Sequence, residues 1–177
     1  ADPANYEIGT GALDVSGLAV GAYTRLFGFV TPFGMAPPDF RAESLVDFSA
    51  ARSVLGLYWG IAGSTSPFPA ISSTGITVDL TPVSLHGAIE LGGRLIDVHA
   101  LTTGLALVPA TQGNLLFAIA HRASRRVENF SAFGDFTTKL SSSLTGTTAV
   151  LRVVANGQFD AVTGAFSASQ LLVVLSD

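Results

Sequence analysis

The chain has 177 residues, of which 48% are hydrophobic and 12% are charged, and its mean hydropathy is +0.50. This composition excludes a disordered chain, and the net charge of -4 opposes the phosphate attraction on which nucleic-acid binding depends. The absence of cysteine excludes disulfides and thiolate metal sites, and no apolar run approaches the roughly 20 residues of a membrane helix. We therefore expect a single domain spanning residues 1–177, with no nucleic-acid partner and no transmembrane segment.

In chain order, the first predicted element is a β-hairpin near residues 22–48. Its two strands carry the apolar patterns Gly28-Phe-Val30 and Phe40-x-Ala42-x-x-Leu45, and the turn between them contains Gly34 and two prolines. Alternation with period two is typical of a strand with one buried face.

Three further strands and one helix follow outside the hairpins. We expect strands at residues 53–61, 76–80 and 115–121, where apolar runs are bounded by clusters of glycine, proline and serine. A short helix at residues 135–144 could be capped by Asp135 or Thr137.

Two more hairpins are predicted near residues 82–102 and 150–175, because their patterns superimpose without a gap. Gly87-Ala-Ile-Glu-x5-Ile-x-Val-x-x-Leu101 lies over Gly157-Gln-Phe-Asp-x5-Phe-x-Ala-x-x-Leu171. Gly92-Gly93 suits a two-residue turn, and the segment from Asp160 to Gly164 suits a longer turn closed by a left-handed glycine. The fold class that follows is all-β, a small antiparallel barrel or sandwich built from repeated β-hairpins with at most one short helix.

The repeated hairpin pattern, together with the approach Leu18-Ala-Val-Gly-Ala-Tyr-Thr-Arg-Leu-Phe-Gly-Phe-Val30, resembles an uncharacterised family of bacterial exported β-rich domains that often occur in lipoproteins. The resemblance covers about half of the chain. It implies a small barrel and a secreted, periplasmic or envelope-attached location, and it brings no assigned activity. The first residues, Ala-Asp-Pro-Ala-Asn, lack the pattern of a signal peptide, which suggests a processed or trimmed chain.

The most specific site hypothesis is a divalent metal bound by the central hairpin. A two-residue turn at Gly92-Gly93 pairs His86 with His99 across the strands and places Asp97 one diagonal step away. Two imidazoles and a carboxylate are typical ligands of zinc or non-haem iron, and Glu90 could add a fourth ligand or a base. The alternative is a solvated sheet face on which the histidines bind no cofactor.

Two ligand-binding surfaces are also predicted. The first is an aromatic platform for a sugar or an extended peptide, and the alternative is that the same side chains fill the core. The second is an anion site in a basic run, and the alternative is a solvated loop. The platform residues are Tyr58, Trp59 and Phe68, and the basic residues are Arg122, Arg125 and Arg126.

No hydrolase, nucleotide-binding or zinc-protease motif is present in the sequence. The favoured hypothesis is therefore a non-catalytic exported binding or structural module, with no enzymatic activity, whose apolar surface is covered by a partner such as a second copy of the chain. Two alternatives remain open: a small barrel enclosing an apolar ligand, and a cupin-like metalloenzyme using the two histidines and Asp97.

Overall fold

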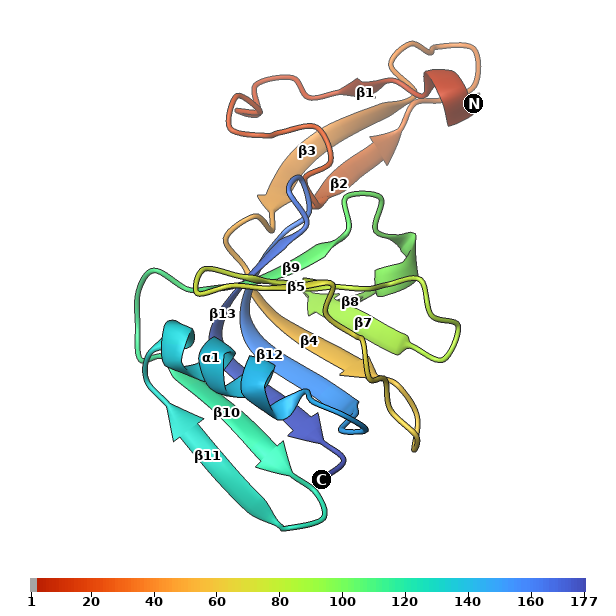
Figure 1. Ribbon diagram of the computed structural model, residues 1–177. Helices are drawn as coiled ribbons and strands as arrows, with labels where there is room; N and C mark the ends of the chain where they lie inside the picture. The colour runs from red at the N-terminus through yellow and green to blue at the C-terminus, as the bar shows by residue number, and fades with distance from the viewer. Residues whose placement is uncertain (1–2) are drawn as a thin grey trace. The chain divides into compact units, whose positions relative to one another are not determined.

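The computed structural model describes residues 3–177 (Figure 1), and the chain divides into two compact units, Ala1–Ser49 and Ala50–Asp177. No helix in the described range is long and apolar enough to span a membrane. The predicted β-rich fold is confirmed, and α1 is the one described helix longer than a single turn.

The first unit is a three-stranded sheet. A short 3-10 helix, η1 (Pro3–Asn5), precedes β1 (Ile8–Gly9), β2 (Thr24–Val30) and β3 (Phe40–Asp47). The strand order is β1-β3-β2; β2 pairs with β3 antiparallel and β1 pairs with β3 parallel. This confirms the hairpin predicted near residues 22–48.

The second unit contains ten strands, a 3-10 helix and one α-helix. They are β4 (Arg52–Tyr58), β5 (Ala70–Ile71), β6 (Ile76–Val78), β7 (His86–Leu91), β8 (Arg94–Asp97), η2 (Val98–Ala100), β9 (Leu105–Pro109), β10 (Leu116–His121), β11 (Arg126–Phe130), α1 (Phe133–Ser143), β12 (Val150–Asp160) and β13 (Ala165–Leu175). Hairpins form at both remaining predicted places, as β7–β8 and β12–β13, and β4, β6 and β10 confirm the three separate strands. The β7–β8 ladder is the shorter one: it ends at Ala88 and Asp97, and residues 98–100 form η2 in place of a strand.

The sheet of the second unit is built around β13. Its strands follow the order β5-β6-β9-β13-β12-β4-β7-β8, and β10 lies beside β13 and carries β11. One edge of β13 pairs along its length with β12, while the other edge is shared, first by β9 and then by β10 (Figure 1).

The topology corrects the expected antiparallel barrel or sandwich. Both β9 and β10 run parallel to β13, so the sheet is mixed, and the terminal strands β5 and β8 pair with no further strand among the described residues. The antiparallel expectation was wrong because period-two alternation reports one buried face and not the direction of the neighbouring strand. The sheet therefore has two ends and does not close.

The core lies on one face of this sheet, beneath α1. On β12 the side chains of Val153, Ala155 and Phe159 are buried on this core face, whereas Val154 and Asn156 lie on the opposite face, here called the outer face. Four phenylalanines join α1 to β10 and β11 through edge-to-face and tilted ring contacts: Phe117, Phe130, Phe133 and Phe136. The outer face carries no such layer over Gly56, where a Cβ would meet open space.

Helix α1 begins two residues before the predicted start. Its N-cap is Ala132, which has no side chain that can accept a hydrogen bond, and neither Asp135 nor Thr137 caps it. The hydroxyl of Thr137 donates instead to the carbonyl of Gly134 within the first turn. The beginning of α1 at Phe133 is explained by the packing of Phe133 and Phe136 on Phe117. Burial of these rings stabilises the helix more than the missing side-chain cap destabilises it.

Candidate functional site

A polar groove lies on the outer face, where β4, β12 and β13 meet the segment after β9. Its volume is about 430 Å³, within the range of roughly 300 to 1,000 Å³ typical of small-molecule sites. We call it the outer groove, and it is lined by Ala50, Arg52, Ala110, Thr111, Gln112, Gly157, Gln158, Ser167 and Ser169.

The outer groove depends on an irregularity in the β12–β13 hairpin. The pairing shifts by one residue between Asn156 and Gly157, so that an extra residue, Ser169, is accommodated on β13. The Ser169 hydroxyl donates to the carbonyl of Asn156 at 3.1 Å. Gly157 is required here because a Cβ would overlap the carbonyl oxygen of Ser167.

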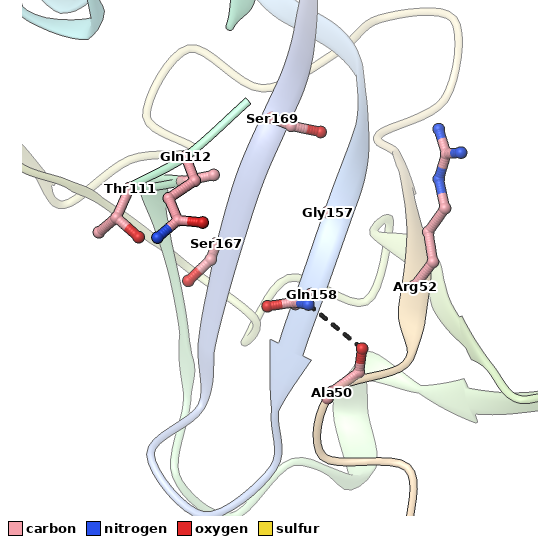
Figure 2. A pocket seen from close by; sticks show the side chains of 9 residues that line it. Ala50, Arg52, Thr111, Gln112, Gly157, Gln158, Ser167 and Ser169 are labelled. Atoms are coloured by element: carbon pink, nitrogen blue, oxygen red, sulfur yellow. Dashed lines mark hydrogen bonds between the residues drawn. The ribbon is translucent and has the colours of Figure 1, made fainter. Parts of the chain in front are cut away.

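Side chains from several segments are oriented around this bulge (Figure 2). Arg52 stands on one side of the groove, Thr111 and Gln112 stand on the other, and Gln158 and Ser167 lie between them. The Gln158 side-chain amide donates to the carbonyl of Ala50 at 3.2 Å, which holds the glutamine in place. Its carboxamide oxygen accepts no hydrogen bond from the described residues.

The lining of the outer groove offers one charged group and several neutral polar groups. Arg52 is the single ionisable residue in its lining, and the other polar groups are neutral hydroxyls and amides. The lining contains no histidine, lysine or carboxylate that could activate Ser167 or Ser169 as a nucleophile. The groove can therefore supply one positive charge and several hydrogen bonds.

The predicted metal ligands lie near one another but are not arranged as predicted. The β7–β8 ladder has the expected register, with Leu91 opposite Arg94 and Ala88 opposite Asp97, but it ends there. Asp97 caps η2 by accepting a hydrogen bond from the backbone N–H of His99 at 2.9 Å. His86 instead pairs in register with Tyr58 on β4.

The His99 ring is engaged with the backbone. Its Nε2 lies 2.9 Å from the carbonyl oxygen of Leu85, and because a carbonyl can only accept, Nε2 carries the proton in this contact. Asp97 and His86 line the same shallow hollow as His99, about 510 Å³ in volume. Over residues 3–177, no three His, Asp or Glu side chains are placed to hold a metal ion together.

The predicted aromatic platform is divided between two sides of the sheet. Trp59 is 1% exposed and Phe68 is 9% exposed, and their rings meet edge to face in the core. Tyr58 alone is exposed, on the outer face. The three residues therefore do not form one surface.

The predicted basic run forms the β10–β11 turn. Arg122 and Arg125 are exposed in the turn, and Arg126 begins β11 and pairs with Glu128 at 3.3 Å. The Glu128 carboxylate also lies 3.6 Å from the ammonium of Lys139 on α1. Part of the positive charge of this segment is therefore neutralised within the protein.

Sequence reasoning missed a histidine between two carboxylates beside this turn. His121 is buried, with Nδ1 at 3.0 Å from Asp177 and Nε2 at 3.4 Å from Glu128. The two acids lie at opposite nitrogens of the ring, so the three groups cannot converge on one ion. We interpret them as a structural link between β10, β11 and the segment after β13.

Comparison with known protein families, with curated proteins and with solved structures gives no match for this chain.

Proposed function

We propose that this chain is a non-catalytic, exported binding module whose outer groove takes a small polar ligand that carries a carboxylate, such as an acidic sugar. The observation that carries the proposal is the placement of Arg52 as the one charged group among neutral hydroxyls and amides. Export is supported only by the family resemblance of the repeated hairpins.

The groove suits a ligand with one negative charge and several hydroxyls. A guanidinium binds a carboxylate through two parallel hydrogen bonds, which is stronger than a neutral pair. Gln112, Gln158 and Ser167 offer donors and acceptors that match hydroxyl groups, while the methyl groups of Ala50 and Ala110 supply the apolar part of the lining.

Titration with glucuronate and glucose, followed by NMR, tests this proposal. Glucuronate should shift the backbone amide signals of Gly157, Ser167 and Ser169, and Arg52→Ala should weaken glucuronate binding by about tenfold, the effect of losing one charge-assisted pair. Arg152→Ala is the matched control, since Arg152 lies exposed on the outer face beside Tyr58 and outside the groove.

The ligand class is contradicted if glucose binds as well as glucuronate, or if Arg152→Ala weakens glucuronate as much as Arg52→Ala does. Binding by neither sugar, with no signal shift in the groove, would remove acidic sugars from the candidates. A shift confined to other surfaces would show that the outer groove is not the binding site.

A metal-dependent function is the second candidate, and it is favoured by one observation. His86, Asp97 and His99 line a single hollow, although one nitrogen of His99 is already bonded to the backbone. Elemental analysis of protein purified without a His-tag, repeated on His86→Ala and His99→Ala, tests it. Near-stoichiometric metal that is lost in both variants would favour a metalloenzyme, and metal-free protein that also shows no affinity on titration would exclude the site.

The third candidate is a barrel that encloses an apolar ligand. The fold does not support it, because the sheet of the second unit is open.

A further inference from the structure

The β2–β3 and β12–β13 hairpins share one irregular geometry. In the first, the pairing shifts where Gly28 faces Ala42; in the second, it shifts where Gly157 faces Ala168. At either glycine a Cβ would overlap a carbonyl oxygen of the facing strand. These two copies of the sequence repeat therefore share one structure, whereas the β7–β8 ladder ends at Ala88 and has no such shift.

The equivalence extends to a third strand. Phe40 and Phe166 stand two residues before the facing alanine of each hairpin, and each is paired in parallel with one further strand. Ile8 of β1 lies opposite Phe40, just as Leu107 of β9 lies opposite Phe166. The set β1, β3 and β2 thus reproduces β9, β13 and β12.

The two three-stranded sets differ in the strands and side chains that pack against them. In the second unit, β4 pairs with the remaining edge of β12, antiparallel, and the core buries the inner side chains. In the first unit, β2 pairs with β3 alone among residues 3–177, and no hydrophobic side chain of residues 4–49 is buried. Phe27, Phe29 and Val30 on β2 are 52%, 69% and 72% exposed.

The backbone of β2 is oriented to accept another strand. The N–H of Phe48 bonds to the carbonyl of Tyr23, and the N–H of Thr31 bonds to the carbonyl of Asp39, so the odd-numbered residues point their backbone groups at β3. The even-numbered residues from 24 to 30 therefore point theirs at the other edge. An edge strand with such groups and few charges is a template for pairing with another chain.

We propose that β2 pairs antiparallel with β2 of a second copy of this chain, with Phe27 facing Phe27 of that copy at the two-fold axis. In this register the backbone N–H and C=O groups of Leu26 form hydrogen bonds with those of Gly28 in the partner. It forms a six-stranded sheet across the two first units, with the same contact made twice.

The side chains in this register are complementary. The two Phe27 rings meet as a cross-strand aromatic pair, and Arg25 lies beside Phe29 of the partner, as it already lies 5.5 Å from the ring centre of Phe48. Arg25 is the one charged residue of β2, so no like charges face each other. Thr24 lies opposite Val30, and Leu26 opposite a glycine that has no side chain to exclude it.

Cross-linking tests the pairing directly, because the chain contains no cysteine. Phe27→Cys would place two thiols across a close strand pair, within the geometry of a disulfide. Oxidation with diamide should link this variant about tenfold or more faster than Val83→Cys, because pairing raises the effective concentration of the thiols. Val83 is the matched control, since it is 93% exposed in the second unit.

Light scattering on the full chain tests the same contact without cross-linking. The unmodified protein should have the mass of a dimer, while Phe27→Lys and Phe27→Glu should each be monomeric because like charges meet at the two-fold axis. An equimolar mixture of the two variants should restore the dimer, which also shows that both are folded.

Three outcomes overturn the proposal. A monomer at all concentrations removes the second copy as the partner, and a dimer that persists in both charged variants places the contact elsewhere. The third is equal cross-linking rates for the two cysteine variants. Binding of a labelled peptide with the β4 sequence, Arg52 to Tyr58, by the monomer would assign the β2 edge to a different strand.

Discussion

At the scale of single residues, aspartates close several turns of this protein. The Thr163 hydroxyl donates to the Asp160 carboxylate and lowers its pKa below the usual value; slight burial opposes this effect, and the backbone N–H groups of Val162 and Thr163 lower the pKa further. The pKa of Asp79 is lowered in the same way, by the backbone and hydroxyl of Thr81. These bonds hold the turns that end or begin strands.

Replacing Thr163 by valine should raise the pKa of Asp160 toward its ordinary value, because the strongest donor to the carboxylate is removed. An NMR titration of the aspartate side chains measures this. The pKa of Asp79 should not change in the variant, and an equal change at both residues would contradict the assignment to Thr163.

The sign of the pH effect follows from these pKa values. A carboxylate whose pKa is lower in the folded state stabilises the fold fully above its unfolded pKa, and this contribution is lost as the pH falls through the folded pKa. Thr163→Val should therefore lose less stability on acidification than the unmodified protein. Because Asp160 is exposed, solvent screening keeps the effect small.

The histidine geometry illustrates what a residue pattern leaves undetermined. Gly92-Gly93 correctly predicted the register of β7 and β8, since a two-residue turn fixes the pairing on both sides. The same register does not reach His99, because Asp97 uses its carboxylate to cap η2 and the chain leaves the ladder. Where a strand ends depends on such local competition, which the alternation of apolar residues does not report.

At the scale of elements, the glycine of the bulge should be intolerant of substitution. Gly157→Ala should lower the free energy of unfolding by roughly 2 to 3 kcal/mol, because its Cβ would overlap the Ser167 carbonyl. Gly56→Ala is the matched control in the neighbouring strand, where a Cβ meets nothing within 4 Å, and it should be neutral or slightly stabilising. Urea denaturation measures both. Equal losses would show that the bulge is not the cause.

Helix α1 should depend on its buried ring more than on its sequence propensity. Phe136 is fully buried against Phe117, Phe130 and Phe133, so Phe136→Ala should cost about 3 to 5 kcal/mol. Ser141→Ala, at an exposed position of the same helix, should change stability by less than about 0.5 kcal/mol. Thermal unfolding followed by circular dichroism compares them, and similar effects would argue against packing as the main source of helix stability.

Elements with local partners could be predicted, and those with distant partners could not. The three hairpins were recognisable because each strand pairs with the next one along the chain. The parallel pairs of β13 with β9 and β10 join strands separated by dozens of residues, and nothing in the apolar pattern of Ala165–Leu175 distinguishes one neighbour from another. The glycine shared by the repeats stands at a bulge in β2–β3 and β12–β13 but not in β7–β8, so the sequence pattern predicted neither the bulge nor the groove.

At the scale of the whole molecule, the hydrophobic core belongs to the second unit. All buried hydrophobic side chains among the described residues lie between Leu55 and Leu175. A fragment of residues 50–177 should therefore fold by itself, with a melting temperature close to that of the main transition of the full chain. Calorimetry on both proteins measures this, and an unfolded fragment would contradict the prediction.

The outer groove could not be predicted because it exists only at this scale. Its lining comes from segments near Arg52, Thr111, Gln158 and Ser167, and the one pattern among them, the hairpin repeat of residues 157–171, indicates strands and not a binding site. Single polar residues in strands read as the solvated side of a sheet, which is correct for each one separately. Their convergence is a property of the strand order β9-β13-β12-β4.

The central position of β13 has a consequence for biosynthesis. Ribosomes deliver the chain from its amino end, so β4, β6, β9, β10 and β12 all emerge before the strand that joins β9, β10 and β12 into one sheet. Until then the apolar side chains of these strands lack their final neighbours. The pairing of β13 with β9 and β10 is also slow to form, because the paired strands are far apart in the sequence. The sheet of the second unit can therefore be completed only after Ala165–Leu175 has been synthesised.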